Sequence, residues 1–331
     1  MLSVVIPVYR NEAFVPALME AFERIAERAQ RDHGQAVEFV FVVDGSPDAS
    51  HARLAQALPA ARFASQLVEH ARNFGSFAAI RTGLQAGRGA YFAVIAADLQ
   101  EPPELLLAFL DAMASGRADI AVGRREGRDD PAMSRLGANL FWKLYRRLVM
   151  RDIPEGGVDV FGCTRQVRDQ LLALPESHSS LVGQLFWLGF RRVEIPYRRR
   201  AREHGKSAWT LRKKVRYLSD SIFAFTDLPI RLLLILGGIG LALATVLGTT
   251  VLVLRLAGVL QVPGYAATIL VILFFGALNV FGLGLVGAYA ARAFENTKSR
   301  PIAVTRSARI FDGAAASDPS PRTQPISDEA L

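Results

Sequence analysis

The chain has 331 residues, of which 51% are hydrophobic, and it carries a net charge of +8 at pH 7. This length is enough for one sizeable globular domain with appended segments. The apolar residues concentrate in two uncharged runs, 232–254 and 263–291, and the single cysteine, Cys163, excludes an internal disulfide.

The N-terminal part alternates apolar, strand-like runs with segments of helical spacing. The expected strands are 2–9, 37–44, 63–68, 90–98 and 118–122. The expected helices are 13–29, 49–58, 74–86 and 103–115. This alternation is typical of an α/β fold with a mostly parallel, Rossmann-like sheet covered on both faces. Ligands bind beyond the carboxyl ends of such strands, and polar residues follow four of them, at 9–12, 44–48, 98–101 and 123–125.

Two amphipathic helices are expected after this alternating part, at 134–150 and 209–225. In each, apolar side chains share one face and basic residues surround it. Basic amphipathic helices commonly lie in the membrane interface. For 134–150, an ordinary surface helix packed on the domain is an equally good interpretation.

The two uncharged runs predict a transmembrane hairpin over 226–292, since each exceeds the roughly 20 residues that a helix needs to cross a bilayer. A pair of buried core helices is the alternative. The segment 191–216 holds eleven Lys or Arg against two Glu, whereas the loop 255–262 carries one basic residue. Positively charged flanks favour the cytoplasm, so we expect a multi-pass protein of the inner (plasma) membrane with both termini cytoplasmic.

Three further expectations complete this organisation. Met1 precedes a strand-like run at once, so no cleavable signal peptide is expected. The basic segment suits anionic lipid headgroups; a nucleic-acid patch is the competing interpretation, and we expect no nucleic acid as partner. The domains are then 1–225, cytoplasmic and catalytic; 226–292, transmembrane; and 293–331, a cytoplasmic tail that is disordered from about 313.

Asp98 and Gln100 are the candidate metal ligands. They follow an expected strand and precede Pro102 and Pro103. Carboxylate and amide oxygens are suitable ligands for Mg²⁺ or Mn²⁺. Taken alone, the same residues also fit a turn or a helix cap.

Short motifs extend over most of the chain in a fixed order. They are VVIPVYRNE (4–12), VVDGSPD (42–48), ARNFG (71–75), AADLQEPPEL (96–105), VGRR (122–125), GGVDVFGCTR (156–165), LFWLGF (185–190), REHGKSAW (202–209) and RAFENTKSRP (292–301). Their order resembles family 2 glycosyltransferases of the GT-A type. Within that family, it resembles the polyprenyl-phosphate glycosyltransferases that include dolichyl-phosphate mannose synthase and its bacterial relatives.

The resemblance implies a GT-A nucleotide-diphospho-sugar transferase fold. It also implies an inverting transfer of a sugar from a nucleotide diphosphate, with UDP expected, to a polyprenyl (undecaprenyl) phosphate, with Mg²⁺ or Mn²⁺ as cofactor. The residues implied in nucleotide binding are Pro7, Tyr9, Glu12, Asp44, Arg72, Lys206 and Ser207. Those implied in catalysis are Asp159, near the reacting centre, and Arg124 and Arg135, which receive the acceptor phosphate. Asp98 and Gln100 are implied to hold the metal ion.

The sequence departs from the family pattern at Val43 and Ala96, where the family often has carboxylates, and at Ala208, where it tends to have Lys. A nucleotide-sugar-binding scaffold protein is therefore an alternative function. A processive polysaccharide synthase is another, although Gln184 is not followed by the Arg of its acceptor motif.

Two polar residues have open interpretations. A lipid phosphate is already anionic near pH 7, so we expect Asp159 to orient the acceptor or a cationic partner rather than to abstract a proton; a turn cap is the alternative. Asn279, in the second apolar run among several glycines, predicts helix–helix contact and a possible homo-oligomer.

Overall fold

The computed structural model describes residues 1–126, 142–154, 157–174, 176, 179–200, 211–257 and 265–313. The chain forms two compact units. The sheet unit comprises Met1–Glu176, Ser180–Thr210 and the chain from Arg300 onward. The hairpin unit comprises Leu211–Ser299 with Ser177–Ser179.

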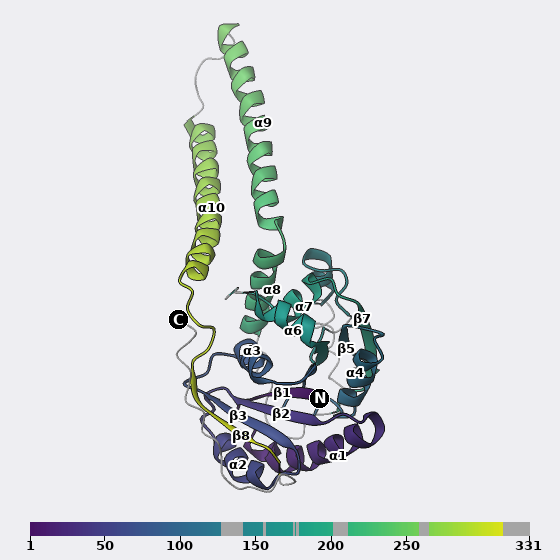
Figure 1. Cartoon of the computed structure of the whole chain (residues 1–331). Helices are drawn as coiled ribbons and strands as arrows, with labels where there is room; N and C mark the ends of the chain where they lie inside the picture. Colours follow the sequence, from purple (N-terminus) through teal and green to yellow (C-terminus); the bar gives the residue numbers. More distant parts are fainter. Residues whose placement is uncertain are drawn as a thin grey trace. The chain divides into compact units, whose positions relative to one another are not determined.

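An eight-stranded sheet forms the centre of the sheet unit, with the strand order β7-β5-β6-β4-β1-β2-β3-β8 (Figure 1). The strands are β1 Leu2–Val8, β2 Val37–Val43, β3 Ala64–His70, β4 Tyr91–Val94, β5 Ile120–Arg125, β6 Phe161–Thr164, β7 Arg192–Tyr197 and β8 Thr305–Phe311. Neighbouring strands are parallel except where β6 pairs with β4 and β5, and where β8 pairs with β3. The expected α/β fold with a mostly parallel sheet is confirmed.

The helices of the sheet unit connect and cover these strands. They are α1 Val15–His33, α2 Ser50–Ala57, α3 Ser76–Ala86, α4 Leu105–Ala114, α6 Arg165–Leu172 and α7 Leu181–Trp187. Short 3₁₀ helices, η1 Glu12–Phe14 and η2 Leu58–Ala60, flank α1 and α2. Each strand and helix expected before residue 126 is present within a few residues of its expected bounds. The sequence pattern did not predict β6, β7, β8, α6 or α7.

Strand β2 shows why the N-terminal half forms this sheet. Its odd-numbered residues Phe39 and Phe41 pack with Phe22 of α1, with the Phe22 and Phe39 rings stacked 4.4 Å apart. Its even-numbered residues Val40 and Val42 pack with α3 on the opposite face. Figure 1 shows α1 and α3 on these two sides of the sheet. Because a central parallel strand is buried on both faces, it reads as a continuous apolar run rather than an alternating one.

One charged side chain is buried inside this apolar layer. Glu38 of β2 is fully buried and accepts hydrogen bonds from Ser3 (2.8 Å), Gln66 (2.8 Å) and the Arg88 backbone N–H (3.0 Å) and side chain (2.6 Å). Burial raises the pKa of Glu38, but the hydrogen bonds from Arg88, Gln66 and Ser3 outweigh it, so the pKa lies below its usual 4.5. The ionised carboxylate therefore fastens β1, β2, β3 and the segment after α3 together.

Glu38→Gln should destabilise the sheet unit by about 2 kcal/mol, because it removes the buried charge that accepts hydrogen bonds from Ser3 and Gln66 and pairs with Arg88. The stability that Glu38 contributes is present above its unfolded-state pKa and is lost as the pH falls through the lower folded-state value. We therefore expect the wild type to lose its advantage over the variant below about pH 4.5. Thermal unfolding of the two proteins across this pH range measures the effect. Glu20→Gln, at an exposed i,i+4 pair with Arg24, is the control and should change little.

The hairpin unit consists of α8 Leu211–Phe225, α9 Leu228–Leu256 and α10 Tyr265–Thr297. Two segments, Leu228–Val251 and Phe274–Thr297, are long and apolar enough to cross a membrane. In the most apolar stretch of each segment, only 6% and 0% of the residues, respectively, are buried. This exposure argues against the alternative of a pair of core helices, and it favours association with a membrane.

Helix α8 packs within the hairpin unit. Arg292 of α10 forms an ion pair with Asp220 of α8 at 2.9 Å, and its guanidinium lies 4.5 Å from the Phe223 ring centroid. Tyr289 contacts the same ring at 5.0 Å. The sequence analysis placed 209–225 with the N-terminal domain, whereas these contacts join α8 to the hairpin.

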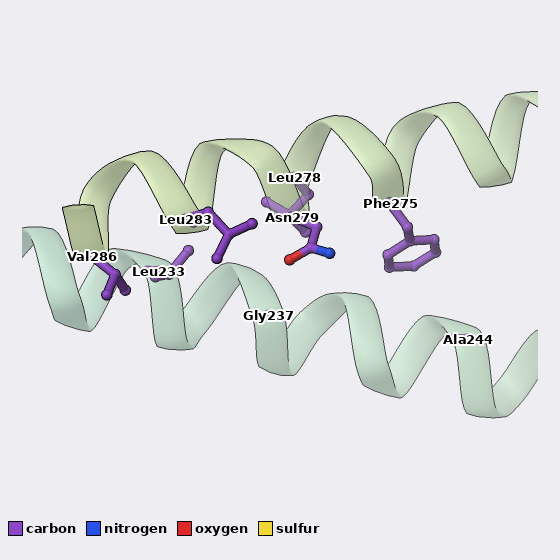
Figure 2. Close-up of a pocket in the computed structure, with 9 residues that line it drawn as sticks. Leu233, Gly237, Ala244, Phe275, Leu278, Asn279, Leu283 and Val286 are labelled. Atoms are coloured by element: carbon purple, nitrogen blue, oxygen red, sulfur yellow. The ribbon is translucent and has the colours of Figure 1, made fainter.

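An open groove of about 640 Å³ lies between α9 and α10. Figure 2 shows Asn279 of α10 projecting into it among Leu278, Leu283 and Phe275. Among the glycines of α10, a Cβ at Gly282 would contact Leu233 of α9, whereas Gly276, Gly284 and Gly287 face open space. Asn279 thus lines a helix–helix interface, and a homo-oligomer stays a prediction.

Cys163, on the interior strand β6, is fully buried. Burial raises the pKa of its thiol to about 12.

Candidate active site

The loops that follow β1 and β2 are joined by reciprocal hydrogen bonds. The Glu12 backbone N–H donates to Asp48 at 3.1 Å, and the Ala49 N–H donates to the Glu12 carboxylate at 2.9 Å. Glu12 thereby fixes the relative position of the two loops. Tyr9, which directly follows β1, is 40% exposed. Pro7, two residues before it on the strand, is half-buried.

Asp44, at the end of β2, is 3% exposed and holds the loop 71–75. Its carboxylate accepts the backbone N–H groups of Phe74 at 2.8 Å and Gly75 at 2.7 Å. It also lies 2.9 Å from Nδ1 of the buried His70, whose other ring nitrogen contacts Thr82. The carboxylate thus organises the loop, while its expected role toward the base or ribose stays a prediction.

Close backbone contact brings the loop 71–75 against Gly45. Gly45 has φ +55°, and a Cβ there would lie 2.3 Å from the Arg72 carbonyl carbon, so only glycine fits. Arg72 itself is exposed, with its guanidinium 4.0 Å from the Phe74 ring centroid. The loop therefore presents a cationic side chain next to the ends of β1 and β2.

Asp98 and Gln100 follow β4 and are brought together by a strained turn. Leu99 between them has φ +52°, which is unfavourable for a side chain of this size and costs about 1 kcal/mol or more. The Gln100 N–H lies 3.4 Å from Asp98 Oδ1. Gln100 is 7% exposed, and its side-chain oxygen accepts a hydrogen bond from Arg199 at 2.5 Å. Such local strain is concentrated at functional sites.

A buried carboxylate next to this turn was missed by the sequence analysis. Glu101 is 0% exposed and pairs with Arg199 at 3.1 Å. Burial raises the pKa of Glu101, against the lowering effects of Arg199 and Arg125, and the charge of Asp98 adds to the increase. The pKa of Tyr197 is also raised, first by burial and then by Glu101. The sequence signal that could have identified Glu101 was its position between an apolar strand and two prolines.

Asp159 lies beside this cluster. It forms an ion pair with Arg125, whose side chain is 5% exposed, and Tyr197 donates a hydrogen bond to it at 3.4 Å. Arg124 instead pairs with Glu126 at 3.1 Å and Glu194 at 3.3 Å. The structure thus pairs Asp159 with Arg125, and its expected role in orienting the acceptor or a cationic partner stays a prediction.

Trp142 packs on the segment that leads to Asp159. Gly157 has φ +80°, and a Cβ there would lie 2.1 Å from the Trp142 ring. Residues 142–148 are helical and bury Tyr145, while Leu144 is 41% exposed. Of the predicted site residues, Arg135, Lys206 and Ser207 lie outside the described residues.

The donor atoms for a divalent cation are few. The described residues contain no group of three or more His, Cys, Asp or Glu side chains at metal-binding distance. Asp98 supplies a carboxylate, whereas the Gln100 amide oxygen would have to exchange its hydrogen bond from Arg199 for the cation. Mg²⁺ is commonly bound by one or two carboxylates with substrate phosphates and water completing its coordination. The residues present fit a cation of this kind.

Comparison with known proteins agrees with the fold and the order of the motifs. Residues 3–173 match the family described as glycosyl transferase family 2. The undecaprenyl-phosphate 4-deoxy-4-formamido-L-arabinose transferase of Pseudomonas paraeruginosa is 33% identical over 306 residues, covering 91% of this chain and 88% of the relative. The bactoprenol glucosyl transferase of Shigella phage SfX is 28% identical over 301 residues, covering 91% and 97%.

Among solved structures, glucosyl-3-phosphoglycerate synthase from Mycobacterium tuberculosis, in complex with Mn²⁺, UDP-glucose and phosphoglyceric acid, superposes with a TM-score of 0.51. It is 13% identical, and the superposition covers 68% of this chain and 79% of that one. The likeness shows the fold. With a family match over half of its length and a 33% identical relative over nine-tenths of it, this chain belongs to glycosyl transferase family 2 and is an enzyme of that family.

Proposed function

We propose that this enzyme transfers a sugar from a nucleotide diphosphate sugar, with UDP as the expected nucleotide, to undecaprenyl phosphate at the cytoplasmic face of a membrane. The observation that carries the proposal is the cluster at the ends of β4 and β5. There Asp98 and Gln100 lie beside a group of arginines, in a chain that also contains two membrane-span candidates. The names of the two relatives supply the acceptor class.

The reaction is a displacement at the anomeric carbon. A phosphate oxygen of the lipid forms the new bond to that carbon, and the bond to the nucleotide diphosphate breaks, with its electron pair leaving on the diphosphate. Attack in line with the departing group inverts the configuration. Because the lipid phosphate is already an anion near pH 7, no side chain has to remove a proton from it.

Each part of the site has a distinct task in this reaction. Asp98 and Gln100 would hold Mg²⁺ or Mn²⁺, which neutralises charge on the leaving diphosphate when bound. The loop 71–75 and the loop after β1 hold the nucleotide. Arg125, which Asp159 keeps oriented, attracts the acceptor phosphate, while the role expected for Arg124 and Arg135 at that phosphate stays a prediction. Positioning two anions in line in this way can supply much of the rate enhancement.

Transfer of radiolabel from a panel of nucleotide sugars into organic-extractable lipid tests the proposal. The full-length protein in membranes with undecaprenyl phosphate should give a labelled lipid with Mn²⁺ and none with EDTA. A labelled polymer would instead identify a processive synthase. Nucleotide binding without any product would identify a scaffold protein. A thermal-shift screen of the same nucleotide sugars identifies the base, because a bound ligand raises apparent stability.

Ala96→Asp should tighten Mn²⁺ binding by about tenfold, because ligand charge sets the affinity of such oxygen sites. Ala96 is half-buried two residues before Asp98, where the family often has a second carboxylate. Electron paramagnetic resonance of free Mn²⁺ during titration measures the affinity directly. Ala96→Asn is the matched control, and equal binding by the Asp and Asn variants would show that position 96 does not face the cation.

A further inference from the structure

The chain returns to the sheet unit after the hairpin and adds a strand to its edge. Strand β8 begins at Thr305, eight residues after α10 ends at Thr297, and pairs antiparallel with β3. Figure 1 shows this C-terminal strand, in yellow, running along β3. Its far end is also fixed, since Phe311 packs against the core, and Gly313 lies so near Phe63 that a Cβ would be 3.1 Å from its carbonyl carbon.

The pairing of β8 with β3 contains an irregularity at one point. Thr305 is opposite His70, and Ser307 is opposite Glu69, so Arg306 is an extra residue in β8. Such a bulge redirects the side chain that it carries. Arg306 pairs with Glu69 at 3.4 Å and donates to the Ala71 carbonyl at 3.4 Å.

The residues contacted by β8 lead directly into the loop 71–75. The Ala71 N–H donates to the Val304 carbonyl at 2.9 Å, and Ser307 donates to Glu69 at 3.3 Å. Beyond Ala71, the loop is attached to Asp44 through the Phe74 and Gly75 N–H groups. The beginning of the loop is thus fixed by the C-terminal strand and its end by Asp44.

We propose that β8 positions the donor-binding loop, and that Arg306 is the positioning residue through which it does so. The inference rests on the proposed function in one respect, since Arg72 and Asp44 are assigned to the nucleotide there. Arg306 does not touch the substrate. Arg306 determines how often the loop adopts the arrangement in which the Arg72 guanidinium packs on the Phe74 ring, next to the ends of β1 and β2.

The prediction concerns donor affinity rather than turnover. Arg306→Ala should raise the KM for the donor about fivefold and change kcat less than twofold, because a loop that is correctly placed less often lowers apparent affinity by that fraction. Arg306→Lys keeps the charge and should restore part of the affinity. Arg309→Ala is the matched control, because Arg309 is exposed on the same strand and its side chain makes no hydrogen bond or ion pair to the residues that the structure describes.

Hydrogen exchange of the backbone amides at 72–75 gives a second measurement that needs neither donor nor acceptor. These amides should exchange several-fold faster in Arg306→Ala than in the wild type and in Arg309→Ala, because local opening becomes more frequent. Equal exchange and equal KM in the Ala variants at 306 and 309 would overturn the inference. If the wild type makes no lipid-linked sugar, the proposed function fails, while the exchange comparison still decides the role of β8.

Discussion

Asp98→Asn should lower the rate of sugar transfer by about 100-fold or more, because it removes the carboxylate charge available to the cation at the leaving diphosphate. With Ala96 in place of a second acidic residue, Asp98 and Gln100 are the candidate metal ligands among the described residues of this loop. The substitution does not alter Leu99, whose backbone has φ +52° between these two residues. The transfer rate and Mn²⁺ affinity should therefore fall together, and both are measured on the same full-length protein.

The control for this variant is Asp111→Asn on α4. Asp111 is an exposed aspartate that pairs with Arg117, and its neutralisation should leave transfer and Mn²⁺ binding unchanged. If Asp98→Asn retained wild-type Mn²⁺ affinity while its activity fell, the aspartate would act on the substrate instead of on the cation. Full activity in the variant would remove Asp98 from the mechanism.

Asp159→Asn should slow transfer by about 100-fold while leaving the affinity for UDP within about twofold, because it removes a charge–charge contact near the acceptor rather than one at the nucleotide. The side chain of its partner Arg125 is 5% exposed. In the variant, the buried guanidinium would lose the opposite charge of Asp159, and we expect Arg125 to turn toward the Glu101 carboxylate. Single-turnover transfer rates and UDP titrations of the detergent-solubilised protein separate the two effects.

Asp152→Asn provides the matched comparison for Asp159. Asp152 also pairs with an arginine, Arg192, at 3.4 Å, but its side chain is 73% exposed. This variant should transfer at the wild-type rate. Unchanged turnover in Asp159→Asn would contradict the orienting role of Asp159. The residue would then be a turn residue after Gly157.

The sequence predicted the first half of the fold well because the signals there are local. Strand β2 is apolar except for Glu38, and polar residues such as Asp44 and Asp98 follow the apolar strands closely. Since parallel strands align their carboxyl ends, placing the candidate site at this edge required no tertiary information. The later strands depend on distant partners: β8, with the sequence TRSARIF, alternates polar and apolar residues weakly, and its contact partner Glu69 precedes Arg306 by 237 residues.

A second limit of prediction from the sequence was the choice between neighbouring residues. The sequence offers Arg124 and Arg125 side by side, and adjacent strand residues point to opposite faces. Only the pairing of β5 with β7 shows that Arg125 is the one opposite Tyr197 and next to Asp159. Glu101 was missed for a related reason, since its ion-pair partner Arg199 lies 98 residues later in the chain.

The burial of Cys163 makes this protein convenient for chemical labelling. The thiolate is the reactive form of cysteine, and a fully buried thiol with a pKa of about 12 should not react with maleimides at neutral pH. The wild-type sequence is therefore already a cysteine-free background in practice. A cysteine introduced at Gln261, between the two apolar helices, can be labelled from outside intact cells if that loop is extracytoplasmic, which gives the membrane topology an experimental answer without altering the catalytic unit.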